Sequence, residues 1–170
     1  MKASAPIETE RKFLIKMPSA STLEALNGCV KSEIVQTYLF SEPVVTRRVR
    51  KKVSDRGTKY ILTDKTRISE MSCIEKESEI DEKRYLELLK DTLSNTSPVQ
   101  KTRYAIPYGS FVWEIDIYPF WQDRAIAEIE LQSEEQKFEI PPFISVIKEV
   151  THDKRYKNRA LAQSIPQENI

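Results

Sequence analysis

Short segments of the chain alternate between apolar and polar side chains, which is the period of a β-strand. In the clearest case, Phe111, Trp113, Ile115 and Ile117 share one face, and polar side chains occupy the other. The same pattern, bounded by turn residues, predicts strands at 7–15, 33–40, 44–50, 58–65, 72–80, 99–106, 111–118 and 125–132. About eight strands joined mostly by short turns predict an antiparallel barrel or a strongly curved sheet.

Three other regions favour helices. In the first, at 19–28, Ser21 is a candidate N-cap, with Glu24 three residues later as in a capping box. In the second, at 81–93, apolar residues recur at helical spacing. After a Pro-Pro interruption, one or two short helices are predicted within 142–165. The chain is therefore expected to be an α+β protein with a dominant sheet.

Composition places the chain among ordinary globular proteins. It has 170 residues, of which 39% are hydrophobic and 31% charged, and its net charge is +1. These values predict one domain with a real core, and no overall field that would attract nucleic acid or a membrane. The domain is expected to span 7–165, between a loose tail at 1–6 and a C-terminal tail at 166–170. Because the chain lacks an apolar run long enough for a membrane span or a signal peptide, a cytoplasmic protein is expected.

The residues that the chain lacks exclude several kinds of site. Of its three glycines, no two fall within one phosphate-binding loop, which excludes the glycine-rich phosphate cradles. His152 is the only histidine, and Cys29 and Cys73 show no metal-ligand spacing. A zinc site of His and Cys or a Ser-His-Asp triad is therefore not expected, and the cysteines are predicted to be reduced thiols. If the protein binds phosphate, it must use Lys and Arg side chains.

The polar face of the predicted strands is almost purely ionic. Glu8, Glu10 and Lys12 share one face of the first strand. Six further strands carry a same-face set: Arg48 with Arg50, Lys59 with Lys65, Glu75 with Glu77 and Glu79, Lys101 with Arg103, Glu114 with Asp116, and Glu128 with Glu130. Like charges gathered on one strand repel unless opposite charges lie across from them, roughly 5 Å away. This face either lies in water, as in a one-sided sheet, or lines a closed interior where basic and acidic strands compensate.

An inward-facing ionic lining would define a particular chemistry. Carboxylate rows suit hard divalent cations, which prefer oxygen ligands. Lysine and arginine side chains supply donors for a polyanion, and a guanidinium group can bind two phosphate oxygens at once. Together, and without a glycine loop, they indicate a site for a polyphosphate held by side chains.

These residues resemble the CYTH family, also called triphosphate tunnel metalloenzymes, and above all its short bacterial single-domain members. The family signature is Glu-x-Glu-x-Lys on the first strand, here at 8–12. Later matches follow in order: Arg48-Val-Arg50, Lys65, Glu75-Lys-Glu-Ser-Glu-Ile80, Lys101-Thr-Arg-Tyr104, Trp113-Glu-Ile-Asp116, Ala127-Glu-Ile-Glu-Leu131, and KEVTHDKRYKN at 148–158. The likeness covers residues 7 to 162.

The resemblance implies an eight-stranded antiparallel β-barrel with a charged tunnel, a few flanking helices, and Mg or Mn as cofactor. By position, it implies metal binding by Glu8, Glu10 and a glutamate of the pair Glu128 and Glu130. Phosphate contacts are implied for Lys12, Arg48, Arg50, Lys65, Lys101 and Arg103. Lys148, Lys154 or Arg155 is expected either to close one end of the tunnel or to lie on a solvated helix surface.

The leading functional prediction is a metal-dependent hydrolase of a small-molecule triphosphate, above all inorganic tripolyphosphate. Water is the expected nucleophile, activated by the metal or by a carboxylate. Candidate bases, which could instead hold tunnel arginines in place, are Glu75, Glu77, Glu114 and Asp116. The alternatives are a nucleoside or thiamine triphosphatase, a class IV-type adenylate cyclase, and a non-catalytic polyphosphate-binding module. A homodimer is compatible with the family, with Trp121 or Phe120 as candidate contacts.

Overall fold

The computed structural model describes residues 7–170, so the predicted tail at 1–6 lies outside the described residues. The strands are β1 (Ile7–Lys16), β2 (Val30–Leu39), β3 (Val45–Ser54), β4 (Gly57–Arg67), β5 (Ser72–Ile80), β6 (Val99–Tyr108), β7 (Phe111–Ile117), β8 (Arg124–Leu131) and β9 (Val146–Glu149). The helical segments are α1 (Ala20–Glu24), α2 (Glu82–Leu88), α3 (Asn158–Leu161) and two short 3₁₀ helices, η1 (Leu89–Asp91) and η2 (Lys154–Tyr156). All of the predicted strands are confirmed, with ends shifted by a few residues.

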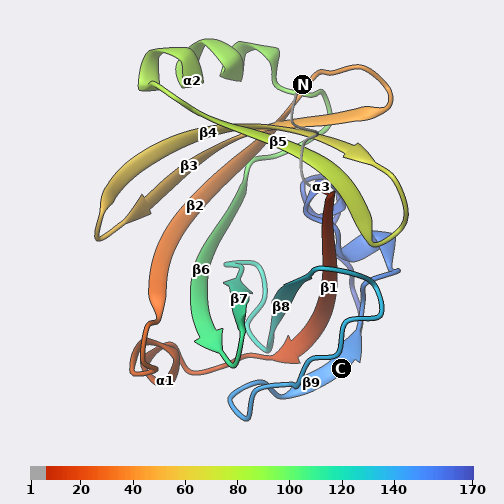
Figure 1. Ribbon diagram of the computed structural model, residues 1–170. Helices are drawn as coiled ribbons and strands as arrows, with labels where there is room; N and C mark the ends of the chain where they lie inside the picture. The colour runs from red at the N-terminus through yellow and green to blue at the C-terminus, as the bar shows by residue number, and fades with distance from the viewer. Residues whose placement is uncertain (1–6) are drawn as a thin grey trace, which may run out of the picture.

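Eight strands form a closed antiparallel barrel (Figure 1). Their order around the ring is β5-β4-β3-β2-β6-β7-β8-β1, and β1 closes the ring by pairing with β5. This closure is short, because its register pairs are only Ile7 with Ile74, Glu8 with Cys73 and Thr9 with Ser72. The other edge of β1 pairs with β8 along Thr9 to Lys16. The predicted eight-stranded barrel is therefore confirmed.

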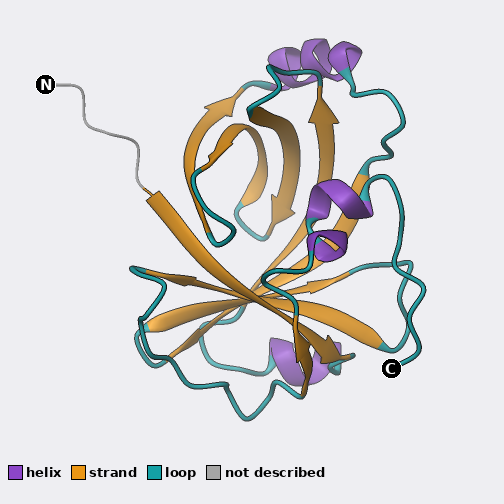
Figure 2. Ribbon diagram, turned by 90° about the vertical axis from the view of Figure 1, so that its right-hand side faces the viewer, coloured by secondary structure: helices purple, strands orange, loops and turns teal. Residues whose placement is uncertain are grey.

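β9 is an additional strand outside the ring. The prediction of helices alone within 142–165 is wrong here, because Val146–Glu149 pairs antiparallel with the second half of β1. A strand of four residues is too short to display the alternation that revealed the others. η2 and α3 follow it, and Figure 2 shows them beside the barrel, at a level between α1 and α2.

The apolar core lies largely outside the barrel wall. Phe13, Trp113 and Ile129 point outward from β1, β7 and β8, and they pack with Leu23 of α1. Phe138, in the loop after β8, contacts the rings of Phe13 and Trp113 edge-on. α2 covers a second apolar cluster over β2, β3 and β4. Because alternate side chains point to opposite faces of a strand, this outward packing leaves the ionic face turned inward.

A further apolar cluster fills one end of the barrel interior. Leu14 and Ile126 continue the inward-facing rows of β1 and β8, and both are fully buried. Leu161 of α3 packs against them. We call this cluster the apolar floor; its buried members are Leu14, Tyr38, Val99, Tyr118, Trp121, Ile126, Val150, Tyr156, Leu161 and Ala162. The charged part of the interior ends at this floor.

Trp121 belongs to the apolar floor and is 7% exposed, and Phe120 is partly buried against the same cluster. The candidate role of Trp121 as a contact between copies is therefore wrong, because the segment after β7 folds back onto its own chain. The homodimer itself stays a prediction.

The helices are shorter than predicted, and one cap differs. Ser19, and not Ser21, is the N-cap of α1, and its side chain accepts a hydrogen bond from the backbone of Thr22. The N-cap of α2 is Asp81, which accepts a hydrogen bond of 2.7 Å from the backbone N–H of Arg84. Within residues 7–170, no helix combines the length and apolar character needed to cross a bilayer.

Candidate functional site

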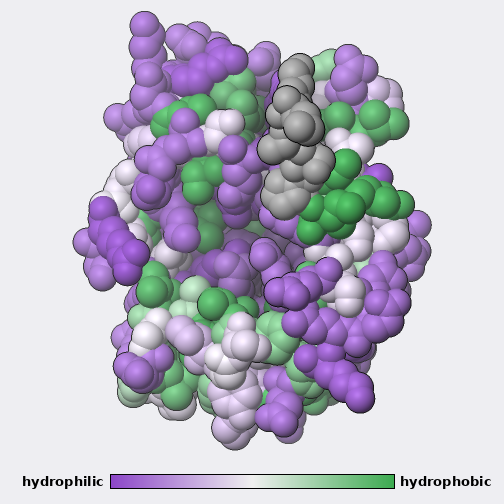
Figure 3. All heavy atoms as spheres, viewed as in Figure 1, coloured by the Kyte–Doolittle hydropathy of each residue, from purple (hydrophilic) through white to green (hydrophobic). Residues whose placement is uncertain are grey.

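The inward-facing charged rows enclose a cavity of about 660 Å³. Figure 3 shows a hollow with hydrophilic residues near the middle of this face of the molecule. The predicted site residues that line the cavity are Glu8, Glu10, Lys12, Arg48, Arg50, Lys65, Glu75, Glu77, Arg103, Glu114, Glu128 and Glu130. The alternative in which this face is an ordinary solvent-exposed sheet face is therefore excluded.

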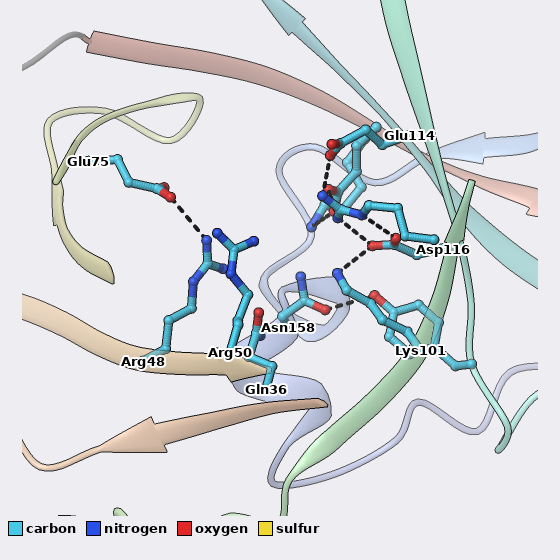
Figure 4. A network of polar contacts seen from close by, with 12 residues as sticks. Gln36, Arg48, Arg50, Glu75, Lys101, Glu114, Asp116 and Asn158 are labelled. Atoms are coloured by element: carbon cyan, nitrogen blue, oxygen red, sulfur yellow. Dashed lines mark hydrogen bonds and ion pairs between the residues drawn. The ribbon is translucent and has the colours of Figure 1, made fainter. Parts of the chain in front are cut away.

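Two predicted site residues, Lys101 and Asp116, also point into the barrel but lie deeper than the cavity, next to the apolar floor. Asp116 is fully buried, and its carboxylate accepts hydrogen bonds from Lys101 Nζ at 2.5 Å and from Arg103 Nε at 2.6 Å (Figure 4). Burial opposes the charge of Asp116, but the adjacent Arg103 and Lys101 outweigh it and lower the pKa of Asp116. Burial, together with the charge of Arg103, lowers the pKa of Lys101 to about 8. Neither side chain lines the cavity, so neither is placed to touch a ligand there.

Half of the glutamates that line the cavity are neutralised by a lysine or arginine neighbour. Glu75 pairs with Arg48 and Lys65, at 3.0 Å in each case. Burial opposes its ionisation, but these two cations lower the pKa of Glu75 to about 2. Glu77 pairs with Arg50, and Glu114 pairs with Arg103. These contacts hold the arginine side chains extended into the cavity, as the structural alternative for these glutamates predicted.

Glu128 is neutralised as well. Its carboxylate lies 2.7 Å from Lys12 Nζ and 3.1 Å from Arg103 Nη2. Burial disfavours its charge, yet Lys12 and Arg103 hold the pKa of Glu128 well below its usual range. Glu128 and Glu130 are the two candidate metal ligands of β8. Glu128 is the one that already forms ion pairs with protein cations.

Glu8, Glu10 and Glu130 differ from these residues, because none of them forms an ion pair with another described residue. Glu10 and Glu130 are register partners across β1 and β8. Burial, followed by the charges of Glu114 and Glu10, raises the pKa of Glu130. Burial and the neighbouring carboxylate of Glu75 raise the pKa of Glu8 to about 7. Three carboxylates without an ion-pair partner among the described residues, gathered on one wall, form a donor set that fits a hard divalent cation.

The cost of ionising Glu8, which comes from burial and from the neighbouring carboxylates, should be measurable in the absence of metal. In the folded protein the pKa of Glu8 is raised above its ordinary value of 4.5. Between about pH 4.5 and 7, the folded protein therefore binds more protons than the unfolded chain. Its free energy of unfolding falls as pH rises through this window. Glu8→Gln removes the titrating group. At pH 8 with EDTA, we expect this variant to be more stable than the parent by about 1–3 kcal/mol, and near pH 4 nearly equal to it.

Urea unfolding at both pH values measures this difference. Glu79→Gln is the matched control, because Glu79 is 61% exposed and lies outside the cavity. A gain at pH 8 that persists unchanged at pH 4 would contradict the explanation by the unfavourable ionisation of Glu8.

The C-terminal segment also contributes to the cavity. Asn158, the last residue of the C-terminal family motif, lines it together with Lys157 and Arg159, which the sequence analysis did not name as site residues. Lys157 Nζ donates to the carbonyl of Glu70 at 3.2 Å, and Arg159 Nη1 donates to Thr46 Oγ1 at 3.2 Å. The only sequence signal was the basic stretch around the buried Tyr156, and it could not tell which of its cations turns inward.

The structure places Lys148 and Arg155 elsewhere. Neither lines the cavity, and both pair with Glu168 near the C-terminus, at 2.5 Å in each case. Lys154, the third candidate, is exposed and also lies outside the cavity. Of the two alternatives for these three residues, the position at the surface fits the structure, and closure of the tunnel by one of them does not. Lys157 and Arg159 line the cavity instead, because β9 and η2 turn the intervening chain so that later residues reach the barrel.

Comparison with known proteins finds inorganic triphosphatases that resemble this chain over most of its length. No protein-family model matches the chain. An inorganic triphosphatase from Nitrosomonas europaea is 34% identical over 164 residues, which cover 94% of this chain and 99% of that protein. An inorganic triphosphatase from Acetivibrio thermocellus is 32% identical, over 92% of this chain and 94% of that protein. A solved crystal structure of an inorganic triphosphatase is 31% identical, covers 94% of this chain and 97% of its own, and has a TM-score of 0.58.

The fold and the site together define a class: an eight-stranded barrel with an ionic interior and an apolar core outside its wall. The relatives extend over nearly the whole chain at identities above 30%. The chain belongs to the CYTH family of triphosphate tunnel metalloenzymes, as the sequence motifs predicted.

Proposed function

We propose that this protein hydrolyses inorganic tripolyphosphate with the help of Mg²⁺ or Mn²⁺. The observation that carries the proposal is the composition of the cavity wall. Arginines and lysines held by their own ion pairs share this cavity with three carboxylates that form no ion pair with another described residue. A polyanion and a divalent cation would complement these two sets of charges. The printed names of the relatives, which are inorganic triphosphatases, support the same reaction.

The basic residues of the cavity are proposed to bind the phosphate oxygens. Arg48, Arg50 and Arg103 are fixed by carboxylates, which orient their guanidinium groups before a ligand arrives. Such preorganised donors stabilise the charge that develops during phosphoryl transfer without further rearrangement. The further cations in this role, by their place in the cavity, are Lys12, Lys65, Lys157 and Arg159.

Glu8, Glu10 and Glu130 are proposed to hold the divalent cation. When bound, such a cation neutralises phosphate charge and lowers the pKa of water. Glu128 is proposed to orient Lys12 and Arg103 instead, because it is already paired with both.

Water is the proposed nucleophile, and a carboxylate of the cavity its base. Glu75, Glu77 and Glu114 remain candidates, since all three line the cavity. Asp116 and Lys101 are proposed to support Arg103 from behind, because both are buried outside the cavity. Lys148 and Arg155, paired with Glu168, are not proposed to bind substrate.

Phosphate release from tripolyphosphate, ATP and thiamine triphosphate, each with Mg²⁺, Mn²⁺ or EDTA, tests the proposal. We expect release to be fastest from tripolyphosphate and to be abolished by EDTA. Faster release from ATP or thiamine triphosphate would favour the nucleoside or thiamine triphosphatase. Formation of cyclic AMP would favour the cyclase. Tight binding without release, measured by calorimetry, would favour a non-catalytic module.

A further inference from the structure

Cys73 lies in the cavity wall where β1 and β5 close the barrel. It is two residues before Glu75 on the inward face of β5, and its register partner on β1 is Glu8. One carboxylate oxygen of each glutamate and the sulfur of Cys73 all lie within 4.8 Å of one another. Two ligands that each lie about 2.0–2.6 Å from one ion are separated by about 3–5 Å. The three side chains can therefore share one cation after small movements.

One oxygen of Glu75 depends on a single exchangeable partner. Glu75 is 7% exposed, and its Oε1 atom accepts a hydrogen bond of 3.0 Å from Arg48. Its Oε2 atom is buried, and its partner is the ammonium group of Lys65, 3.0 Å away but without the alignment of a hydrogen bond. An oxygen held only by one ammonium group can be taken over by another cation. The side chain of Lys65 is 28% exposed, so it can move into the cavity when another cation takes its place.

We propose that Glu8, Cys73 and Glu75 form a site for a thiophilic divalent cation such as Zn²⁺ or Cd²⁺. A thiolate is a soft ligand that favours these ions over Mg²⁺ and Mn²⁺. On binding, the thiol proton passes to solvent, a sulfur–metal bond forms, and the ammonium group of Lys65 leaves Glu75. Because Glu8 also belongs to the proposed Mg²⁺ or Mn²⁺ centre, the inference rests in part on the proposed function. A thiophilic cation at this site would withdraw Glu8 from that centre and inhibit hydrolysis.

Titration of the metal-free protein with Cd²⁺ tests the site directly, because cadmium bound to a thiolate absorbs in the near ultraviolet. We expect a charge-transfer band that saturates at a single equivalent of Cd²⁺ and is absent with Mg²⁺ or Mn²⁺. Cys73→Ser should abolish the band and weaken cadmium binding by more than about tenfold. Cys29→Ser is the matched control and should keep both, because Cys29 lies outside the cavity.

A second pair of variants tests the carboxylate ligand. Glu75→Gln should weaken cadmium binding, whereas Glu77→Gln, two residues further along the same inward face, should leave it unchanged. Circular dichroism of each variant identifies any that fail to fold, and comparison is restricted to the folded ones. Equal weakening by both substitutions would overturn the assignment, because a general loss of negative charge would then explain the binding.

Hydrolysis of tripolyphosphate with Mg²⁺ alone separates this inference from the proposed function. Hydrolysis without a cadmium band, or a band that disappears in Cys29→Ser and persists in Cys73→Ser, would overturn the thiophilic site and leave the proposed function standing. A cadmium band that depends on Cys73 in a protein without hydrolysis would support the site and count against the proposed function. Inhibition by Cd²⁺ that is relieved in Cys73→Ser would support both.

Discussion

Replacing Asp116 by asparagine is expected to lower the free energy of unfolding by about 3–5 kcal/mol. Asp116 is fully buried, and the side chain of its partner Lys101 is only 1% exposed. Asparagine keeps the size of the side chain but removes the charge that compensates Lys101 and Arg103. Two cations would then face each other at the apolar floor with too little negative charge between them. The midpoint and slope of urea unfolding measure the loss.

Asp64→Asn is the matched control for this prediction. Asp64 also receives two hydrogen bonds from one arginine, Arg47, at 2.6 and 2.8 Å, but these side chains are 30% and 40% exposed. Partly solvated pairs contribute about 0–1 kcal/mol, so the control should change stability little. A small effect of Asp116→Asn, together with loss of hydrolysis in a fully stable protein, would instead point to a direct catalytic role for Asp116.

Replacing Glu10 by glutamine is expected to reduce metal-supported hydrolysis of tripolyphosphate at least about a hundredfold. Glu10 is the register partner of Glu130 in the β1–β8 pair and forms no ion pair with another described residue. The substitution removes a charged oxygen ligand from the proposed cation site while keeping nearly the same shape. The defect should be accompanied by weaker binding of Mn²⁺, measured by calorimetry without substrate.

The control for Glu10 is again Glu79→Gln, which changes the same residue type on the exposed end of β5. It should keep activity within about twofold, because surface substitutions of this kind have small effects. Near-normal hydrolysis by the Glu10 variant, at saturating and at limiting Mn²⁺, would remove Glu10 from the proposed centre.

Much of the fold could be predicted because two independent patterns agree. Alternation with period two separated Trp113 and Ile115 from Glu114 and Asp116, and the same division recurs on the other strands. A row of like charges is costly unless it is compensated, so the charges made a closed interior one of two alternatives, and the family motifs favoured it. The identity of most cavity-lining residues followed from the same argument, because the direction of a strand side chain depends only on its parity.

Depth inside the barrel could not be predicted from parity. Asp116 and Glu114 share one face of β7, yet Glu114 lines the cavity and Asp116 lies deeper in the barrel, beyond the end of the cavity. That difference depends on how far the apolar floor extends inward, which is set by Leu161 of the distant α3 and by Trp121 in the loop after β7. The inward turn of Lys157 likewise depends on β9 and η2, whose few residues carry no periodic signal.

The short pairing between β1 and β5 makes the ring unequal around its circumference. Three register pairs join these strands, whereas the antiparallel β3 and β4 hairpin is paired from Val45 to Ser54. Local opening costs the least free energy where the fewest interactions must break, so the barrel is expected to open first at the β1–β5 junction. Glu8 lies on one side of this junction, and Cys73 and Glu75 lie on the other. A metal ion held by residues of both strands would join them, so that binding of the ion would also stabilise the barrel against opening.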